Sequence, residues 1–253
     1  MGTVVRKIGF SAEIYGTRKA MGEAAGKKAE EIILHCLKQK KEVRIITAAA
    51  PSQNELLAFL AKSKAIDWSR VTAFHMDEYI GLAEDAPQGF GNFLRARLFG
   101  RLPFKKVHYI QGGADPAAEC ERYAALLKKG PIDALFCGIG ENGHLAFNDP
   151  PVADFNDPLL VKVVNLDASC RNQQVNDGCF ASLKDVPKRA LTLTIPILMS
   201  AAYAVCTIPG PTKTAAVSRM FNGQVETKCP ASILRFHPAC TVFLDSESGK
   251  GLL

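Results

Sequence analysis

Short apolar segments alternate with helical segments through most of this chain, and this alternation limits the folds open to it. The expected strands are residues 43–50, 71–76, 132–137, 161–166, 191–195, 203–208 and 241–244. The expected helices are residues 12–38, 53–64, 115–129 and 212–221. Such alternation is typical of βαβ units, and nearly continuous apolar strands need helices on both faces. The pattern predicts an α/β fold with a mostly parallel sheet, whose ligands bind beyond the carboxyl ends of the strands.

Composition narrows the class of protein further. The 253 residues, 47% of them hydrophobic, suffice for one core, so we expect a single domain over residues 1–253. The net charge of +6 is scattered, and the cluster at Lys38, Lys40 and Lys41 fits a solvated helix end better than a nucleic-acid surface. The eight cysteines form no CxxC pair and show no zinc-ligand spacing, so we expect no metal. No signal segment and no run of about 18 apolar residues appears, which favours a cytoplasmic protein without a membrane partner.

Two expected helices begin with residues suited to an anion. Ser52 and Glu55 have the spacing of a capping box, and a helix start also attracts phosphate, so Ser52 and Gln53 are candidate substrate-binding residues. An ordinary helix cap is the simpler interpretation of that segment alone. Residues 210–213 open a second helix and add a cation, Lys213, although an exposed lysine beside a cap fits equally well.

Adjacent carboxylates, Asp77 and Glu78, follow the expected strand 71–76. On an extended chain neighbouring side chains point to opposite faces, so the two carboxylates need not share a role. One of them could face a crevice as a general base while the other supports the structure. A helix start or a surface turn is the alternative interpretation.

A glycine-rich loop follows the expected strand 132–137. Gly138, Gly140 and Gly143 imply a tight turn with close backbone approach to a ligand, and His144 follows directly. Imidazole titrates near neutral pH, and Asp149 could hold its tautomer if the chain curls back. A structural histidine beside a turn is the alternative. The glycines also match a dinucleotide-binding pattern, but the strand lies far from the N-terminus and no ribose-binding acid follows.

Three segments together resemble the glucosamine-6-phosphate deaminase and isomerase family, a branch of the superfamily that includes 6-phosphogluconolactonases. FHMDEYIGL is similar to the family's F-N-M-D-E-Y-x-G-L, and GIGENGHLAFNDP is similar to its G-x-G-x-D-G-H-x-A-F-N-E-P. The later stretch VPKRALTLTIPILMSAAYAVCTIPGPTKTAAV resembles a looser family pattern that ends in a strand, a turn and a helix beginning near a lysine. The similarity runs from about residue 10 to about residue 245.

The resemblance implies a modified Rossmann-like three-layer sandwich with neither a metal nor an organic cofactor. It implies chemistry that opens a sugar ring, moves a proton between C2 and C1, and releases ammonia to leave a ketose phosphate. Asp77 matches the residue that moves the proton, His144 the histidine that assists ring opening, and Asp149 the acid that supports this histidine, usually a glutamate. Lys213 and Ser52 match positions of the phosphate site.

The chain departs from the family pattern at several of these positions. Asn142 stands where the family has an acid, and because an amide cannot exchange a proton as a carboxylate does, the ring-opening relay must differ. Glu141 is a neighbouring carboxylate that could compensate. The family's Gly- and Thr-rich phosphate loop is AAAPSQ here. Arg171 is the arginine we place at the substrate, although the usual arginine has no clear match, and Leu160 stands where regulated members have an arginine.

Three functions remain open at this stage. The first is an amino-sugar-phosphate deaminase or a related ketose–aldose isomerase, whose partner is a small sugar phosphate. The second is a 6-phosphogluconolactonase-like hydrolase, which would not need Asp77 as a carbon-acid base. The third is a non-catalytic sugar-phosphate sensor, which would need neither Asp77 nor His144. The sequence leaves open the sugar epimer, the direction of flux and assembly into a homo-oligomer.

Overall fold

A central sheet forms the middle layer of the protein. The structure is a computed structural model that describes residues 2–7 and 10–252. Within these residues the sheet has the strand order β1-β2-β11-β10-β7-β3-β4-β6. In that order the strands span Thr3–Lys7, Phe10–Tyr15, Cys240–Asp245, Tyr203–Ile208, Ala134–Cys137, Val43–Thr47, Val71–His75 and Lys106–His108. Every neighbouring pair is parallel except β1 and β2, which confirms the prediction of a mostly parallel sheet.

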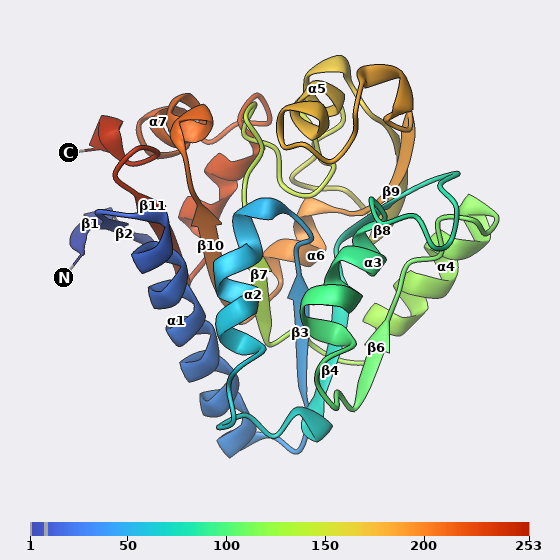
Figure 1. The fold of residues 1–253 in the computed structure, drawn as a ribbon, viewed down its shortest axis with the longest axis horizontal. Coiled ribbons are helices and arrows are strands. Elements are labelled where there is room, and N and C mark those ends of the chain that lie inside the picture. Colours follow the sequence, from blue (N-terminus) through green and yellow to red (C-terminus); the bar gives the residue numbers. More distant parts are fainter. Residues whose placement is uncertain (1, 8–9, 253) are drawn as a thin grey trace.

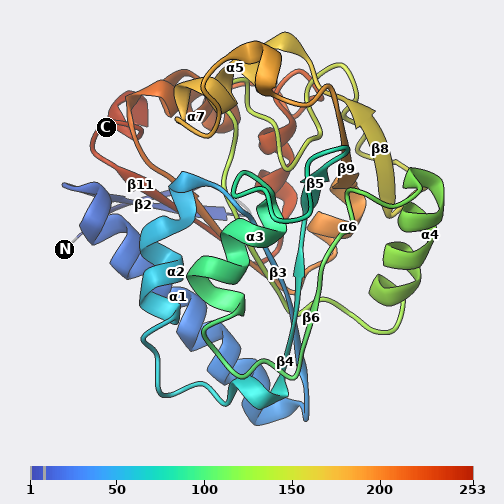
Figure 2. The same ribbon diagram turned by 45° about the vertical axis from the view of Figure 1, so that its right-hand side comes forward.

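Helices cover both faces of this sheet, as the apolar strands predicted. The helices are α1 (Arg18–Gln39), α2 (Asn54–Leu60), α3 (Phe90–Leu94), α4 (Pro116–Leu127), α5 (Ala168–Asn176), α6 (Ile195–Met199) and α7 (Thr214–Asn222), of which α5 lies over the carboxyl edge of the sheet (Figure 1). Ile45 of β3 belongs to the same core as Met21 and Leu57, whereas its neighbour Ile46 belongs to a second core with Leu198. Figure 2 shows α1, α2 and α3 on one side of the sheet and α4 and α6 on the other. The result is a three-layer sandwich.

A second, smaller sheet was not anticipated. Its strand order is β5-β9-β8, with β5 at Asp77–Tyr79, β9 at Arg189–Leu193 and β8 at Val161–Asn165, and both pairs are antiparallel. The expected strands 161–166 and 191–195 are therefore real, but they do not belong to the parallel sheet. An apolar sequence indicates that a strand will be buried, but it does not indicate which strand it will pair with. This sheet matters because β5 carries the two adjacent carboxylates.

The helix expected over residues 12–38 begins later in the structure than predicted. Residues 12–15 lie in β2, whose side chains alternate between buried and half-buried as in a strand with one covered face. Helix α1 begins only at Arg18, because the Thr17 side chain accepts the Ala20 N–H at 3.1 Å and caps the helix there. Strands β1 and β6 were also missed, since both are short and lie at the edges of the sheet.

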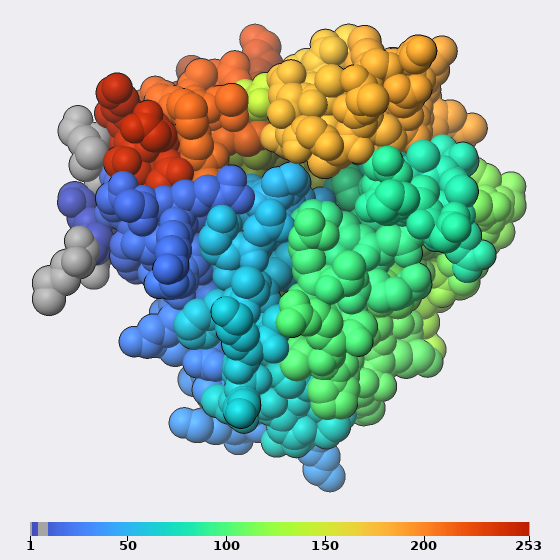
Figure 3. Space-filling view, in the orientation of Figure 1, coloured from blue at the N-terminus to red at the C-terminus, as the bar shows by residue number. Residues whose placement is uncertain are grey.

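The carboxyl ends of the central strands meet at one edge of the sheet. There β3, β4, β7 and β10 are each followed by a loop that the sequence analysis singled out. Figure 1 shows the upper ends of β3 and β4 beneath the segment that contains α5, and shows α7, which follows β10, beside that segment. The space-filling view in Figure 3 shows the α5 segment, in yellow and orange, lying directly against α2 and α3. No helix in the described part of the chain is long and apolar enough to cross a membrane.

Candidate active site

A cavity of about 540 Å³ opens at this edge of the sheet. It is lined by residues that follow the carboxyl ends of β3, β4, β7 and β10, namely Ser52, Asp77, Gly138, Gly140 and Lys213, together with His144. The parallel topology explains the gathering, because parallel strands present all their carboxyl ends to the same edge. Six residues singled out in four separate segments of the sequence therefore lie around one space.

Asp77 is the buried carboxylate of the cavity. It is the first residue of β5 and only 6% of it is exposed. Burial, and to a smaller extent the nearby Glu78 charge, raises the pKa of the Asp77 carboxyl well above its ordinary value. A carboxylate with a raised pKa can take and return a proton closer to neutral pH than an exposed one. Asp77 has the burial and the position of a general base.

Glu78 points away from the cavity and serves the backbone. Its carboxylate accepts N–H groups from Tyr79 at 3.0 Å, Phe90 at 3.0 Å and Gly91 at 2.8 Å. These bonds tie β5 to the start of α3, and they satisfy two free N–H groups of that helix. The prediction that the two carboxylates point apart on an extended chain is confirmed. Glu78 is explained by structure alone, whereas Asp77 is not.

His144 and Asp149 form a pair at the glycine-rich loop. His144 Nδ1 lies 2.9 Å from Asp149 Oδ1, and both residues are buried. The chain therefore curls back, as predicted, and the shorter aspartate reaches the ring without a bridging water. This contact places a carboxylate beside Nδ1 and leaves Nε2 of the ring available to a ligand in the cavity.

Asn142 holds the His144–Asp149 pair in position through two hydrogen bonds. Its Nδ2 donates to Asp149 Oδ1 at 2.8 Å, and its Oδ1 accepts the His144 N–H at 3.0 Å. Burial raises the pKa of the Asp149 carboxyl, but hydrogen bonds from His144, Asn142 and Cys170 outweigh burial and hold that pKa below its ordinary value. Asp149 therefore stays ionised beside the imidazole. Asn142 acts as a positioning residue and does not line the cavity.

Gly140 is required by the His144 ring. A Cβ atom at position 140 would lie 2.2 Å from ring atom Cε1 and 2.3 Å from Nδ1, which no real side chain tolerates. Gly143 has a φ of +89°, a backbone conformation that favours glycine. The glycine spacing thus serves the placement of a histidine and not of a dinucleotide phosphate.

Replacement of Asn142 by aspartate tests this arrangement. The Asn142→Asp variant would place a second carboxylate about 2.8 Å from Asp149, and two like charges so close raise the pKa of the pair. We expect the acid limb of the pH–rate profile to move to higher pH. A pH profile of kcat/KM checks this, and a profile identical to the parent's would contradict the positioning role.

Besides Asn142 and Asp149, which support His144, four of the predicted site residues lie outside the cavity lining. Gln53 is fully buried, and its Nε2 donates to Thr207 Oγ1 at 2.6 Å and to the Cys137 carbonyl at 3.1 Å. The remaining three are Glu141, Gly143 and Arg171. The guanidinium of Arg171 donates instead to the carbonyls of Leu183 and Val186. The structure therefore does not bring Gln53 or Arg171 to the substrate space; both hold loops together.

The cationic end of the cavity contains Ser52 and Lys213. Lys213 is 6% exposed, and among the described residues its Nζ has no hydrogen-bond partner. Burial lowers the pKa of Lys213 despite the opposing charges of Asp177 and Glu141. An unpaired buried ammonium is costly unless a ligand neutralises it. This observation favours an anion-binding role over an exposed lysine beside a cap.

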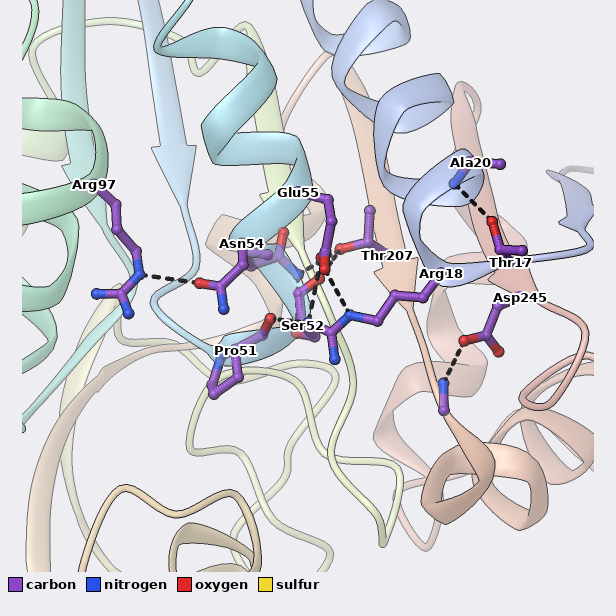
Figure 4. Close-up of polar contacts among 12 residues, drawn as sticks. Thr17, Arg18, Ala20, Pro51, Ser52, Asn54, Glu55, Arg97, Thr207 and Asp245 are labelled. Atoms are coloured by element: carbon purple, nitrogen blue, oxygen red, sulfur yellow. Dashed lines mark hydrogen bonds and ion pairs between the residues drawn. The ribbon is translucent and has the colours of Figure 1, made fainter.

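The capping box expected at this helix start is absent. Helix α2 has no side-chain cap, and Glu55 instead accepts Arg18 Nε at 2.8 Å (Figure 4). Arg18 and Arg97 both line the cavity, and sequence reasoning missed both. No local signal could have found them, because Arg18 comes from α1 and Arg97 lies in the helical turn Arg95–Phe99 that continues α3.

One group within the described residues has side chains suited to a metal. His144, Asp149 and Cys170 offer ligand atoms that all lie within 4.8 Å of one another, a grouping that their spacing in the sequence did not reveal. A cation there would have to displace the contact between His144 Nδ1 and Asp149 Oδ1. A metal-free enzyme stays a prediction, and full activity loss in chelator that a divalent ion restores would contradict it.

Taken together, this cavity can move protons on a small anionic molecule. It brings a buried carboxylate, a carboxylate-supported imidazole and an unpaired ammonium to one space in an α/β fold. These groups define the class of acid–base enzymes that act on small anionic substrates, as opposed to binding modules.

Comparison with known proteins identifies the family. Residues 16–243 match the family model described as glucosamine-6-phosphate isomerases/6-phosphogluconolactonase. A glucosamine-6-phosphate deaminase of Exiguobacterium sp. is 40% identical over 190 residues, covering 75% of this chain and 73% of its own. One of Bacillus cereus is 35% identical over 233 residues, covering 92% of this chain and 85% of its own. The chain belongs to the glucosamine-6-phosphate isomerase/6-phosphogluconolactonase family.

Solved structures agree with this assignment. A monomeric glucosamine-6-phosphate deaminase superposes with a TM-score of 0.86 at 28% identity, covering 95% of this chain and 99% of its own. A 6-phosphogluconolactonase from Thermotoga maritima superposes with a TM-score of 0.76 at 20% identity, covering 92% of this chain and 99% of its own. The second likeness shows a shared fold, the Rossmann-like sandwich expected from the sequence.

Proposed function

We propose that this enzyme is an amino-sugar-phosphate deaminase that converts glucosamine 6-phosphate, or an epimer of it, to a ketohexose 6-phosphate and ammonia. The observation that carries the proposal is the placement of Asp77 in the same cavity as the His144–Asp149 pair. Binding alone needs neither a buried base nor an oriented imidazole. The relatives named above as glucosamine-6-phosphate deaminases support the same reaction.

The proposed reaction uses the groups in sequence. His144, through Nε2, exchanges a proton with the ring oxygen and so opens the sugar to its aldehyde form. Starting from the protonated amine, Asp77 then removes the proton from C2 and returns it to C1, while the nitrogen loses one proton and O1 gains one, which leaves an alcohol at C1 and an iminium at C2. Water adds to the iminium carbon, and ammonia leaves as the ketone forms. Lys213 holds the phosphate throughout, so the sugar carbons stay within reach of Asp77.

Residue 142 differs from the family pattern, and this difference changes the proposed ring-opening step. Asn142 cannot carry a proton, so the relay at the ring oxygen reduces to His144 supported by Asp149. Glu141 is an unsuitable substitute because it does not line the cavity. Asn142 retains a role in orientation, which a sensor protein without chemistry would not need.

One assay separates the three functions. Ammonia release is measured from a panel of 2-amino-2-deoxyhexose 6-phosphates, beside hydrolysis of 6-phosphogluconolactone by the same preparation. We expect ammonia from at least one epimer and no lactone hydrolysis that depends on Asp77. Lactone hydrolysis without ammonia would favour the hydrolase, and binding without either reaction would favour the sensor.

Lys213 gives a test of the phosphate end. Removing its ammonium in Lys213→Ala should weaken sugar-phosphate binding by ~1.5–3 kcal/mol, the range for a hydrogen bond to a charged group. This corresponds to a dissociation constant about 10- to 150-fold higher. Calorimetric titration measures it, with the exposed Lys250→Ala as the control. Lys213→Ala binding as tightly as the parent would overturn the assignment.

The proposal extends to where the enzyme works. All eight cysteines are free thiols, the state favoured in a reducing compartment. We propose a cytoplasmic enzyme whose partner is a diffusible sugar phosphate. The deaminating step consumes water, so the overall reaction is a hydrolysis coupled to an isomerisation.

A further inference from the structure

Two arginines flank the turn that begins α2. Arg97 Nε donates to Asn54 Oδ1 at 3.0 Å, and Arg18 Nε donates to Glu55 Oε1 at 2.8 Å. Figure 4 shows the two side chains on opposite sides of the segment that carries Pro51. Both arginines line the cavity. The first turn of α2 is therefore bracketed by two positive charges that arrive from different elements.

Both guanidinium groups are held in place but keep free donors. Arg18 uses Nε and Nη2 on Glu55 and the Pro51 carbonyl. Arg97 uses Nε, and its guanidinium carbon lies 3.7 Å from the centre of the Phe93 ring. Within the described residues this leaves Nη1 of Arg18 and both Nη groups of Arg97 without a protein acceptor. A fixed guanidinium with free N–H groups is suited to an oxyanion.

The position of Arg18 depends on a close helix contact. A Cβ atom at Gly22 would lie 2.1 Å from Glu55 Cβ, and one at Gly26 would lie 2.5 Å from Phe59 Cβ. Both glycines let α1 approach α2 more closely than any side chain would allow. Arg18 lies four residues before Gly22 and so occupies the same face of α1 one turn earlier. The glycine contact is what carries Arg18 to the start of α2.

The cavity also contains the buried ammonium of Lys213, whose Nζ has no partner among the described residues. We propose that Arg18 and Arg97, together with Lys213, bind the phosphate of the substrate and select for its doubly charged form. The inference rests on the proposed function, because it names the residues that recognise the substrate's anionic group. It assigns a role to two residues that lie outside all three of the segments that resemble the family.

The preference for a doubly charged phosphate follows from the number of cations at this end of the cavity. Glu55 neutralises part of the Arg18 charge, and Asp177 lines the cavity with Lys213, so three cations face two carboxylates at this end. A phosphomonoester loses its second proton near pH 6 and carries a charge of about −2 above that pH. Binding should therefore weaken as the pH falls below 6, and it should weaken less in a variant that lacks both arginines.

The test uses glucitol 6-phosphate, which has no ring to open and no acidic C2 proton, so turnover does not enter. Calorimetric titration compares the parent with Arg18→Gln and Arg97→Gln. We expect each variant to bind about 10-fold more weakly, with KM for the amino sugar raised and kcat little changed. The matched controls are Lys19→Gln and Arg101→Gln, exposed neighbours that do not line the cavity and should bind as the parent does.

A second variant separates charge from folding. Gly22→Ala leaves every cavity residue intact but pushes α1 away from Glu55, so it should weaken binding as Arg18→Gln does while Arg97→Gln adds a further loss. If Arg18→Gln does not fold, Arg18→Lys, which keeps the charge without the planar fork, takes its place and should still bind more weakly.

The outcomes distinguish this inference from the proposed function. Parent-like binding of glucitol 6-phosphate by both arginine variants overturns the inference, whatever the reaction. Weakened binding in a protein that releases no ammonia from any amino sugar overturns the deaminase and leaves the inference standing. A parent protein that binds neither glucitol 6-phosphate nor inorganic phosphate overturns both.

Discussion

Asp77→Asn is expected to lower turnover by about 10²–10⁴-fold, the contribution of one positioned base. The amide keeps the shape of the side chain and removes its basicity, so sugar phosphate should still bind. The decisive measurement is exchange of the C2 proton of open-chain substrate with solvent, since that step needs a base at C2 but no ring opening. Exchange at the parent rate in Asp77→Asn would show that another group is the base.

The matched control is the neighbouring carboxylate. Glu78→Gln disturbs three backbone N–H bonds, so its main effect should be a lower free energy of unfolding. Its C2 proton exchange should exceed that of Asp77→Asn once the protein is folded. If Glu78→Gln lost exchange and Asp77→Asn retained it, the roles of the two carboxylates would be reversed.

The raised pKa of Asp77 also predicts how stability and kcat/KM change with pH. Its pKa in the folded protein is raised by burial, so the folded state keeps this proton to a higher pH than the unfolded chain does. As the pH rises from the unfolded pKa through the folded pKa, the Asp77 contribution to stability falls while kcat/KM rises. Asp77→Asn cannot ionise and should unfold at a higher temperature than the parent at neutral pH. Thermal unfolding checks this.

Asp149→Asn is expected to have the second large effect, a loss of about 10²–10⁴-fold in kcat/KM. The amide would no longer supply the negative charge that supports a protonated His144, and its N–H groups would face the Nδ2 of Asn142. With ring opening impaired, the variant should work better on open-chain substrate than on ring-closed substrate. This comparison, made by stopped flow, separates ring opening from proton transfer at C2.

Asp157→Asn is the control for this variant. Asp157 is a largely buried carboxylate that pairs with Lys162 at 2.8 Å and does not line the cavity. It should cost stability and leave kcat/KM near the parent value. The depressed pKa of Asp149 adds stability above its unfolded pKa that is lost as the pH falls through the folded pKa. Asp149→Asn should therefore lose part of the acid sensitivity of the parent. Equal activity of Asp149→Asn and Asp157→Asn would contradict the pairing with His144.

The sequence by itself determined the local and repeated features of this protein. Alternating apolar strands and helices specified the three-layer arrangement, because strands that are apolar along nearly their whole length must be covered by helices on both faces of the sheet. The residues after the strands specified the candidate site, because parallel strands carry their following loops to one edge. Asp77, His144, Asp149, Ser52 and Lys213 were reached this way. The pairing of His144 with Asp149 was also predicted, from the family resemblance and from the five residues that separate them along the chain.

Only the tertiary structure decided which distant segments meet. The strands near residues 161 and 191 pair with β5 and not with the central sheet, because pairing depends on partners far along the chain. Asn142 replaces an acid of the family pattern, and only the structure shows that it hydrogen-bonds to both His144 and Asp149. Arg18 and Arg97 reach the cavity through helix packing, which depends on side-chain shape across elements and leaves no motif in either segment. Chemistry near a strand end can be predicted from the sequence, whereas charges brought in from other layers appear only once the helices have packed.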